Sequence, residues 1–211
     1  MEGIIIIGAG GLGRETAQLI RDINHREATW DIVGFLDDDI DIHGRVIDGI
    51  PVLGGIDYLN NREADNLRLI CAIGNTKARR KITDKTRKYQ NKYANIIHPS
   101  SNIGYGVKLG QGVVIGAGCV ISVNVEIGDH AFLNPMCGIG HDAIIKPYSM
   151  LLWGVKLGGN TLVGEGCKLG SSSVIIQQRQ IGAWSTVGAG AVVTKDISEY
   201  CTAVGVPARI I

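Results

Sequence analysis

The adjacent pair His141 and Asp142 is the strongest candidate for chemistry in this sequence. A neutral imidazole accepts a proton near neutral pH, and a neighbouring carboxylate can fix its tautomer and stabilise the imidazolium that forms. The pair therefore fits a general base, as in acyl transfer from a thioester to an amine or a hydroxyl. No histidine follows position 141, so the last third of the chain supplies no second imidazole. The alternative interpretation is a solvated polar pair on a surface turn.

The segment that carries this pair repeats every six residues. Aliphatic residues recur at this interval without insertion from Ile97 to Val193, and the residue after each is usually Gly. A period of six predicts a parallel β-helix, in which three hexapeptides close one coil. We expect the aliphatic side chain to point inward, with a small side chain two residues before it. We expect the following Gly to supply a positive φ at a tight corner.

The register of the repeat places the pair at a bend of the coil. Ile139 is the inward residue and Gly140 the expected corner, so His141 and Asp142 lie on or just past the bend. Successive side chains on a flat strand point to opposite faces, so the two can meet only at such a corner. Gly159, one coil above, leaves the neighbourhood of the imidazole open.

The first half of the chain predicts a small α/β unit. The segment Ile4–Ile7 is a buried strand, followed by a G-x-G-x-x-G turn and an amphipathic helix from Glu15. Further strands are expected in "DIVGFLDDD" and "LRLICAIGN", and a basic helix from about Lys77 to Tyr89. This order is typical of a Rossmann-like β-α-β domain with a parallel sheet. We expect this domain over residues 1–95 and the β-helix over 96–211.

The glycine turn and the basic helix each have two interpretations. Backbone N–H groups at the helix start can hold a diphosphate, but this half of a doubly wound fold does not favour NAD. A nucleotide diphosphate with another group attached fits better; alternatively the glycines only permit a tight turn. The run "KARRKITDKTRK" is interpreted as a solvated helix face with Ile82 inward, and a phosphate or nucleic-acid patch is the alternative.

The composition excludes several classes of protein. The net charge of +1, with acids and bases mixed, does not favour nucleic acid or an anionic membrane as partner. No run approaches the roughly 18 apolar residues of a membrane helix, and Met1–Ala9 is interpreted as a strand, not a signal peptide. Five cysteines without a CxxC motif indicate small buried thiols of a cytosolic protein. Cys137 falls at a small structural position, which makes it a poor nucleophile.

Metal binding is not expected. Three histidines could hold zinc only if they met at one level and face of the β-helix. His98, His130 and His141 occupy three different registers of the six-residue count.

The order of several segments resembles that in sugar acyltransferases of the sialic-acid O-acetyltransferase type, which include N-acetyltransferases acting on nucleotide-linked amino sugars. The segments are "IIGAGGLGRE", "GFLDDD", "GIPVLGG", "CAIGNTKARRKI", "IHPS", "LNPMCGIGHD" and "VGVPARII", and they cover nearly the whole chain. The resemblance implies a left-handed β-helix, acetyl-CoA as acyl donor, a homotrimer with active sites between protomers, and a cytoplasmic location.

The resemblance also implies roles for the matching positions. His141 matches the catalytic base, Asp142 the acid that orients it, and Asn134 a polar position near the site. The nucleotide-sugar positions are Gly10, Gly11 and Leu12 along the phosphates, Asp37 and Asp38 near the nucleoside, and Gly74 beneath it. The acetyl-CoA positions are Met150, Gly159, Ser171 and Ala189, along a groove between two β-helices. The chain departs from the family at Leu12 and Met150, where members often carry His.

The expected function is acetyl-CoA-dependent N-acetylation of a nucleotide-linked amino sugar that feeds a surface glycan, by direct transfer with His141 as base. One alternative is O-acetylation of a sugar such as sialic acid, because a general base serves either acceptor. The other is a nucleotide-sugar-binding scaffold without catalysis, which only Met150 favours.

Overall fold

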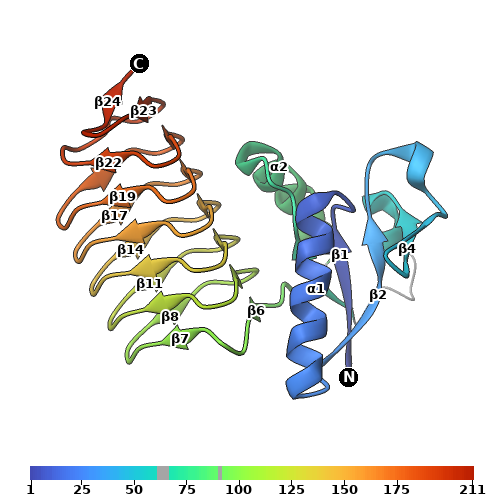
Figure 1. Ribbon diagram of the computed structural model, residues 1–211. Helices are drawn as coiled ribbons and strands as arrows, with labels where there is room; N and C mark the ends of the chain where they lie inside the picture. The colour runs from blue at the N-terminus through green and yellow to red at the C-terminus, as the bar shows by residue number, and fades with distance from the viewer. Residues whose placement is uncertain (61–66, 90–91) are drawn as a thin grey trace. The chain divides into compact units, whose positions relative to one another are not determined.

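The computed structural model describes residues 1–60, 67–89 and 92–211. The chain divides into two compact units, Met1–Ile96 and Ile97–Ile211 (Figure 1). No helix in the described part of the chain is long and apolar enough to cross a bilayer.

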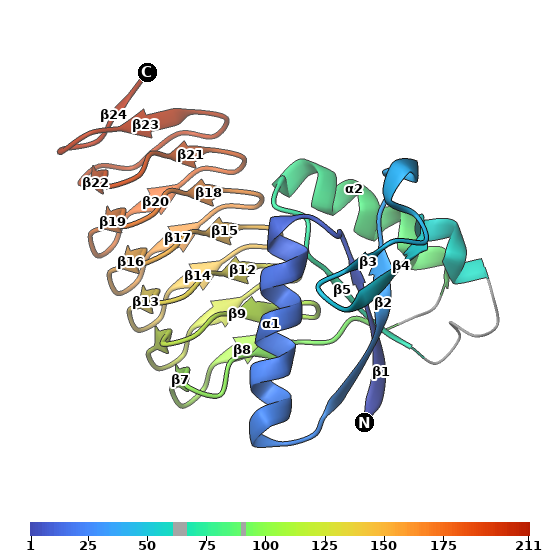
Figure 2. The same cartoon turned by 45° about the vertical axis from the view of Figure 1, so that its right-hand side comes forward.

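The first unit is built on a five-stranded sheet with the order β3-β4-β2-β1-β5 (Figure 2). All neighbouring strands are parallel except the pair β3–β4. The elements are β1 (Glu2–Ile7), α1 (Gly11–Arg26), β2 (Trp30–Leu36), η1 (Ile40–Ile42), β3 (Val46–Ile47), β4 (Ile50–Gly54), η2 (Ile56–Asn60), β5 (Arg68–Cys71), α2 (Thr76–Thr86) and η4 (Arg87–Tyr89). The four isoleucines of β1 are almost fully buried, as expected for a strand covered on both faces.

The glycine turn joins β1 tightly to α1. A Cβ at Gly13 would collide with the carbonyl oxygen of Gly8, so the third glycine of the motif lets the helix pack against the turn. The helix begins at Gly11, four residues before the predicted start at Glu15, because Gly10 already forms its extended N-cap. The strands β3 and β4 were not predicted as strands.

The second unit is a parallel β-helix with three sheets, each named here by its first strand. The β7 sheet contains β7 (Asn102–Ile103), β10 (Val120–Ile121), β13 (Gly138–Ile139), β16 (Lys156–Leu157), β19 (Val174–Ile175) and β22 (Val192–Val193). The β8 sheet contains β8 (Lys108–Leu109), β11 (Glu126–Ile127), β14 (Ile144–Ile145), β17 (Leu162–Val163) and β20 (Gln180–Ile181). The β6 sheet contains β6 (Ile96–Ile97), β9 (Val114–Ile115), β12 (Phe132–Leu133), β15 (Met150–Leu151), β18 (Lys168–Leu169), β21 (Thr186–Val187), β23 (Thr202–Val204) and β24 (Arg209–Ile210).

The coil interior follows the six-residue pattern. Residues eighteen positions apart pair across adjacent strands, as Val120 does with Gly138, so each coil stacks directly on the one below. The periodic aliphatics are buried along most of the β-helix, and so are the small residues two positions earlier, such as Ala143 and Thr161. Ile103 is 37% exposed because β7 is the last strand of its sheet. The predicted fold class, an α/β unit followed by a hexapeptide β-helix, is confirmed.

The predicted role of the repeated glycines is wrong. The positive φ falls two residues later than expected, at every sixth residue from Gly106 to Gly190, with φ between 55° and 74°. Glycines directly after the inward aliphatic, such as Gly140 and Gly164, are not in this region. They face the backbone of the next coil instead: a Cβ at Gly140 would lie 2.5 Å from the backbone nitrogen of Gly159. These glycines are therefore required by close stacking and not by corner geometry.

We expect Gly164→Ala to destabilise the β-helix by about 1–3 kcal/mol, the usual cost of overpacking. The added Cβ would lie 2.6 Å from the backbone nitrogen of Ala183, where no flexible side chain can move aside. Thermal unfolding followed by circular dichroism measures the effect. Gly11→Ala is the control, because a Cβ there meets no atom within 4 Å. Equal melting temperatures for the two variants would contradict the stacking argument.

The five cysteines are all free thiols. Four are buried and Cys201 is partly exposed, so the predicted buried thiols are confirmed for all but the last. Burial raises the pKa of Cys71 to about 12 and that of Cys167 to about 11. The neighbouring thiol of Cys119, together with burial, holds the pKa of Cys137 far above its usual range. The raised pKa favours the protonated thiol, in agreement with the interpretation of Cys137 as a small structural residue.

Candidate active site

The pair His141 and Asp142 occupies the corner between β13 and β14, where the β7 sheet turns into the β8 sheet. Asp142 takes the left-handed backbone conformation, with φ of +57°, which interrupts the alternation of side chains. Its Oδ2 lies 2.7 Å from Nδ1 of His141, and both side chains are about half exposed. The corner thus joins the two groups through Nδ1 of the imidazole, as the sequence register predicts.

Gly159 lies one coil above His141. The backbone N–H of Asn160 donates to the carbonyl of His141 at 2.8 Å, which fixes the spacing of the two coils at this corner. A Cβ at Gly159 would lie 2.5 Å from Nε2 of His141. The missing side chain therefore leaves space at the ring nitrogen that would act as the base.

Asn124 is a neighbour of this pair that sequence analysis missed. Its Nδ2 donates to Oδ1 of Asp142 at 3.3 Å from the coil below. The hydrogen bond with His141, followed by that from Asn124, holds the pKa of the Asp142 carboxyl below its usual range. Once the coil is known to contain eighteen residues, the separation of Asn124 and Asp142 is the signal that identifies the contact.

The other predicted residues of the β-helix lie elsewhere on the coil. Ser171 and Ala189 stand at the corner between the β6 and β7 sheets, and Asn134 follows β12 beside the same corner. Met150 lies in β15 of the β6 sheet and is only 5% exposed. A single chain therefore does not bring these four residues together with His141.

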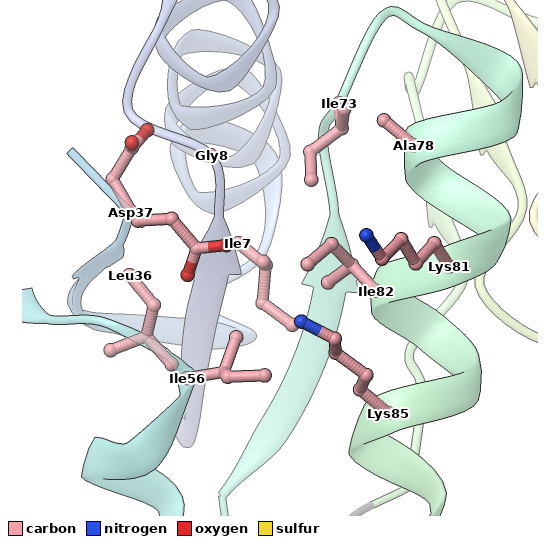
Figure 3. Close-up of a pocket in the computed structure, with 11 residues that line it drawn as sticks. Ile7, Gly8, Leu36, Asp37, Ile56, Ile73, Ala78, Lys81, Ile82 and Lys85 are labelled. Carbon is pink, nitrogen blue, oxygen red and sulfur yellow. The ribbon is translucent and has the colours of Figure 1, made fainter.

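The first unit contains a hollow of about 370 Å³ at the carboxyl ends of its parallel strands (Figure 3). Its walls are mostly aliphatic, and its charged groups are Asp37, Asp38, Lys81 and Lys85. The remaining lining residues are Ile7, Gly8, Leu36, Ile56, Ile73, Ala78 and Ile82. Ligands of open α/β sheets bind at this end of the strands, which makes the hollow the candidate ligand site of this unit.

Asp37 and Asp38, which directly follow β2, have different surroundings. Both carboxylate oxygens of Asp37 accept from backbone amides, Oδ2 from Ala9 at 2.8 Å and Oδ1 from Asp39 at 3.0 Å. Asp37 therefore fastens the end of β2 to the glycine turn. Asp38, exposed at the rim, is the acid whose side chain can meet a ligand.

The start of α1 is open to a ligand. Gly10 and Gly11 are exposed, and a Cβ at either would meet no atom within 4 Å. No side chain caps the helix at Gly10, so its first amides are available to an anion. Leu12 and Gly74 are neighbours, since a Cβ at Gly74 would lie 4.0 Å from Cδ2 of Leu12. Leu12, predicted to lie along the phosphates, is thus next to Gly74, predicted to lie beneath the nucleoside.

The basic run of α2 is divided between interior and surface. Arg79 is fully buried and donates from Nη1 to the carbonyl of Ile73 at 2.7 Å, while Ile82 points inward as predicted. Lys81 and Lys85 are exposed, as a solvated face requires, but they also line the hollow. Figure 3 shows both extending from α2 toward the side where Ile7 and Asp37 lie. Sequence analysis missed this second feature.

The three histidines considered for zinc have separate surroundings. His130 is buried and stacks on Tyr148 with ring centroids 5.4 Å apart. Nδ1 of His98 lies 2.7 Å from the hydroxyl of Ser100, and His141 pairs with Asp142. Over residues 1–60, 67–89 and 92–211, no three potential ligands form a metal-binding group.

Two family descriptions match the chain. Residues 3–86 match the PglD N-terminal domain, and residues 160–195 match the bacterial transferase hexapeptide with six repeats. These matches fall in the first and second structural units respectively.

Similar proteins are known from sequence and structure. WeeI from Acinetobacter baumannii AYE is 28% identical, with a TM-score of 0.90 and full coverage of both chains. PerB from Caulobacter crescentus, solved in complex with CoA and GDP-perosamine, is 30% identical, with a TM-score of 0.79 and coverage of 100% of this chain and 98% of PerB. A curated relative from Aneurinibacillus thermoaerophilus, dTDP-3-amino-3,6-dideoxy-alpha-D-galactopyranose 3-N-acetyltransferase, is 52% identical over 42 residues. That match spans 20% of this chain and 22% of the relative.

The similarity to PerB extends over both units and nearly the whole of both chains. The order of the two domains and the hexapeptide corner that joins His141 to Asp142 agree with the resemblance found in the sequence. The chain belongs to the hexapeptide-repeat family of sugar O- and N-acyltransferases, a family of acetyl-CoA-dependent acetyltransferases.

Proposed function

We propose that the chain transfers the acetyl group of acetyl-CoA to the amino group of a nucleotide-linked sugar, with His141 as general base. The observation that carries this proposal is the corner geometry: Asp142 engages Nδ1 of His141, and Nε2 faces the space left by Gly159. PerB, solved with CoA and GDP-perosamine, and the curated amino-sugar N-acetyltransferase support the choice of donor and acceptor.

The transfer needs no covalent acyl-enzyme. The amine nitrogen attacks the thioester carbonyl, and Nε2 of His141 takes the proton that the nitrogen loses as the N–C bond forms. Asp142 stabilises the imidazolium from the other side of the ring. The C–S bond then breaks, and the imidazolium returns the proton to the thiolate of CoA. Binding both substrates at the corner supplies the effective concentration.

The first unit would hold the nucleotide part of the acceptor. The open start of α1, at Gly10, Gly11 and Leu12, offers backbone amides to the phosphates. The aliphatic hollow suits a nucleoside, with Asp38 in its lining and Gly74 directly after the lining residue Ile73. Lys81 and Lys85 add positive charge to the wall formed by α2. The hollow also contains Asp38 and Asp37, but both carboxylate oxygens of Asp37 already accept from backbone amides. The two ammonium groups can therefore pair with an anionic ligand such as a nucleoside diphosphate.

Removing this charge should weaken nucleotide binding. We expect Lys81→Met with Lys85→Met to raise KM for the nucleotide-sugar by about 5- to 50-fold with little change in kcat, because exposed charge-assisted contacts contribute about 1–2 kcal/mol. The effect should shrink at high salt. Lys77→Met is the matched control, since Lys77 is exposed on the same helix but does not line the hollow. An equal rise of KM in Lys77→Met would show that Lys81 and Lys85 have no specific role in nucleotide binding.

Acetyl-CoA would lie between two protomers. Ser171 and Ala189 stand at a different corner from His141, so a homotrimer with parallel axes would bring the two corners together from neighbouring chains. Exposed apolar side chains at the corner between the β6 and β7 sheets, Met136 at 59% and Trp153 at 52%, support such an interface. Asn134 and Met150 would then belong to the site that forms across it. Sedimentation equilibrium at micromolar concentration measures the mass directly, and a monomer would exclude this arrangement.

The proposed function is tested by following CoA thiol release with UDP-, GDP- and dTDP-linked 4-amino sugars, alongside sialic acid as an O-acceptor. Turnover with an amino sugar would support N-acetylation; turnover with sialic acid alone would support O-acetylation. Nucleotide binding without any turnover would support the non-catalytic scaffold.

Because acetyl-CoA and nucleotide-sugars are cytoplasmic metabolites, we place the reaction in the cytoplasm.

A further inference from the structure

The carboxylate of Asp142 is held from two sides. Its Oδ2 lies 2.7 Å from Nδ1 of His141, and its Oδ1 accepts from Nδ2 of Asn124 at 3.3 Å. Asn124 belongs to the coil below, eighteen residues earlier, so the contact does not depend on the local turn. Since both side chains of the catalytic pair are about half exposed, packing alone does not fix the carboxylate.

The backbone at position 124 does not by itself require asparagine. Asn124 has φ of +57°, in the left-handed region shared by every sixth residue from Gly106 to Gly190. Glycine occupies several of these corners, including Gly106 directly below and Gly118. Either Gly or Asn adopts this conformation at low cost. The backbone conformation therefore does not explain why position 124 carries an amide side chain.

The amide is also oriented by its surroundings. A Cβ at Gly106 would lie 2.5 Å from Oδ1 of Asn124, so the amide oxygen points down into the space that this glycine leaves. The amide nitrogen then points up toward Asp142. An orientation with the oxygen toward Asp142 would place two acceptors against each other.

We infer that Asn124 is a positioning residue: its amide holds the Asp142 carboxylate in the plane in which it accepts from Nδ1–H of His141, and so keeps Nε2 as the free base. The inference rests on the proposed role of His141 as base. Because Asn124 would act through Asp142 and not on a substrate, its loss should affect the chemical step and leave substrate binding unchanged.

A second consequence concerns the charge of Asp142. The hydrogen bond with His141 is the first cause, and that from Asn124 the second, of the lowered pKa of the Asp142 carboxyl. The group facing Asp142 from its own coil is His141, and the group facing it from the coil below is Asn124. Removing the amide should therefore shift the titration of this carboxyl upward, toward that of an ordinary aspartate.

The test compares Asn124→Gly with Asn160→Gly. Asn160 has φ of +55° at the same corner, one coil above Asp142, and is the matched control. Both variants keep a residue that tolerates the corner, so both should fold with the melting temperature of the parent chain. We expect Asn124→Gly to lower kcat by about 3- to 10-fold at constant KM, the range of a single hydrogen bond. We expect Asn160→Gly to leave kcat unchanged.

Two NMR measurements on the intact protein need no sugar acceptor. The ¹⁵N shifts of the His141 ring report its tautomers, and the ¹³C shift of the Asp142 carboxyl reports its titration. Asn124→Gly should raise the population with the proton on Nε2 and shift the Asp142 midpoint upward, whereas Asn160→Gly should do neither. A merely structural role would leave both signals unmoved.

Unchanged ring tautomers and carboxyl titration in Asn124→Gly would overturn the inference, and so would equal changes in Asn160→Gly. Failure of the proposed function would look different. His141→Ala would then retain full turnover, while the NMR signatures of the Asn124–Asp142 contact persisted in the unsubstituted protein.

Discussion

Replacing His141 with Ala should lower kcat by roughly 10²- to 10⁴-fold while KM for acetyl-CoA and for the nucleotide-sugar changes little. The expectation follows from the corner geometry. The imidazole is half exposed, pairs with Asp142 through Nδ1, and has Nε2 beside the space that the missing side chain of Gly159 leaves. Thiol release under saturating concentrations of both substrates measures the loss.

Two further variants make this prediction specific. His98→Ala removes a histidine whose Nδ1 pairs with Ser100 and lies away from the corner, so it should leave kcat unchanged. Asp142→Asn keeps the shape of the acid but cannot stabilise the imidazolium by charge, so its loss of kcat should be smaller than that of His141→Ala. Full turnover in His141→Ala would exclude the imidazole as the base, whatever the result for Asp142.

The sequence predicted the scaffold because one physical constraint recurs along it. Each inward aliphatic residue stacks on the one eighteen residues away, so the interior selects the same residue type at every sixth position. The same register placed His141 and Asp142 at a corner, and the structure joins them there. Periodicity alone was sufficient for this part of the site.

Periodicity was not sufficient where two different constraints select glycine. Gly140 is small because the backbone of the next coil approaches it, while Gly106 is glycine because its φ is +74°. The two kinds of position each recur every six residues. The six-residue period alone therefore cannot distinguish a glycine required by close packing from a glycine required by positive φ. The left-handed corner also accepts Asn, Asp and larger residues such as Trp184, which removes the glycine signal there.

Contacts between coils, and contacts between α2 and the hollow, were also not predicted from the sequence. Asn124 reaches Asp142 from eighteen residues away, and the pairing depends on which polar atoms point up or down at the corner. Lys81 and Lys85 flank the inward Ile82, and their helical phase alone does not show whether they face solvent or a hollow. Such contacts depend on the packing of neighbouring elements.

Replacing Gly159 is the second change that we expect to lower kcat strongly, because the absence of a side chain there leaves space for the imidazole of His141. A Cβ at this position would lie 2.5 Å from Nε2 of His141. The backbone would accept alanine: Ala117, Ala183 and Ala189 occupy the equivalent place two residues after the inward aliphatic at other corners. Gly159 is not among the residues with positive φ. The three atoms nearest to the added methyl group would all belong to the imidazole of His141.

We expect Gly159→Ala to lower kcat by roughly 10- to 100-fold, because a displacement of about 1 Å at a reacting group can cost this much. The ring must rotate away from the methyl, which weakens its contact with Asp142 and moves Nε2 from the acceptor. The melting temperature should change by no more than a few degrees, since relaxation of a half-exposed ring costs little. In a His141→Ala background, Gly159→Ala should have no further effect on kcat, because the two changes act through one side chain. Additive losses of kcat in the double variant would instead mean that Gly159 acts independently of His141, by leaving room for the pantetheine arm of acetyl-CoA. In that case Gly159→Ala alone should raise KM for acetyl-CoA at constant kcat.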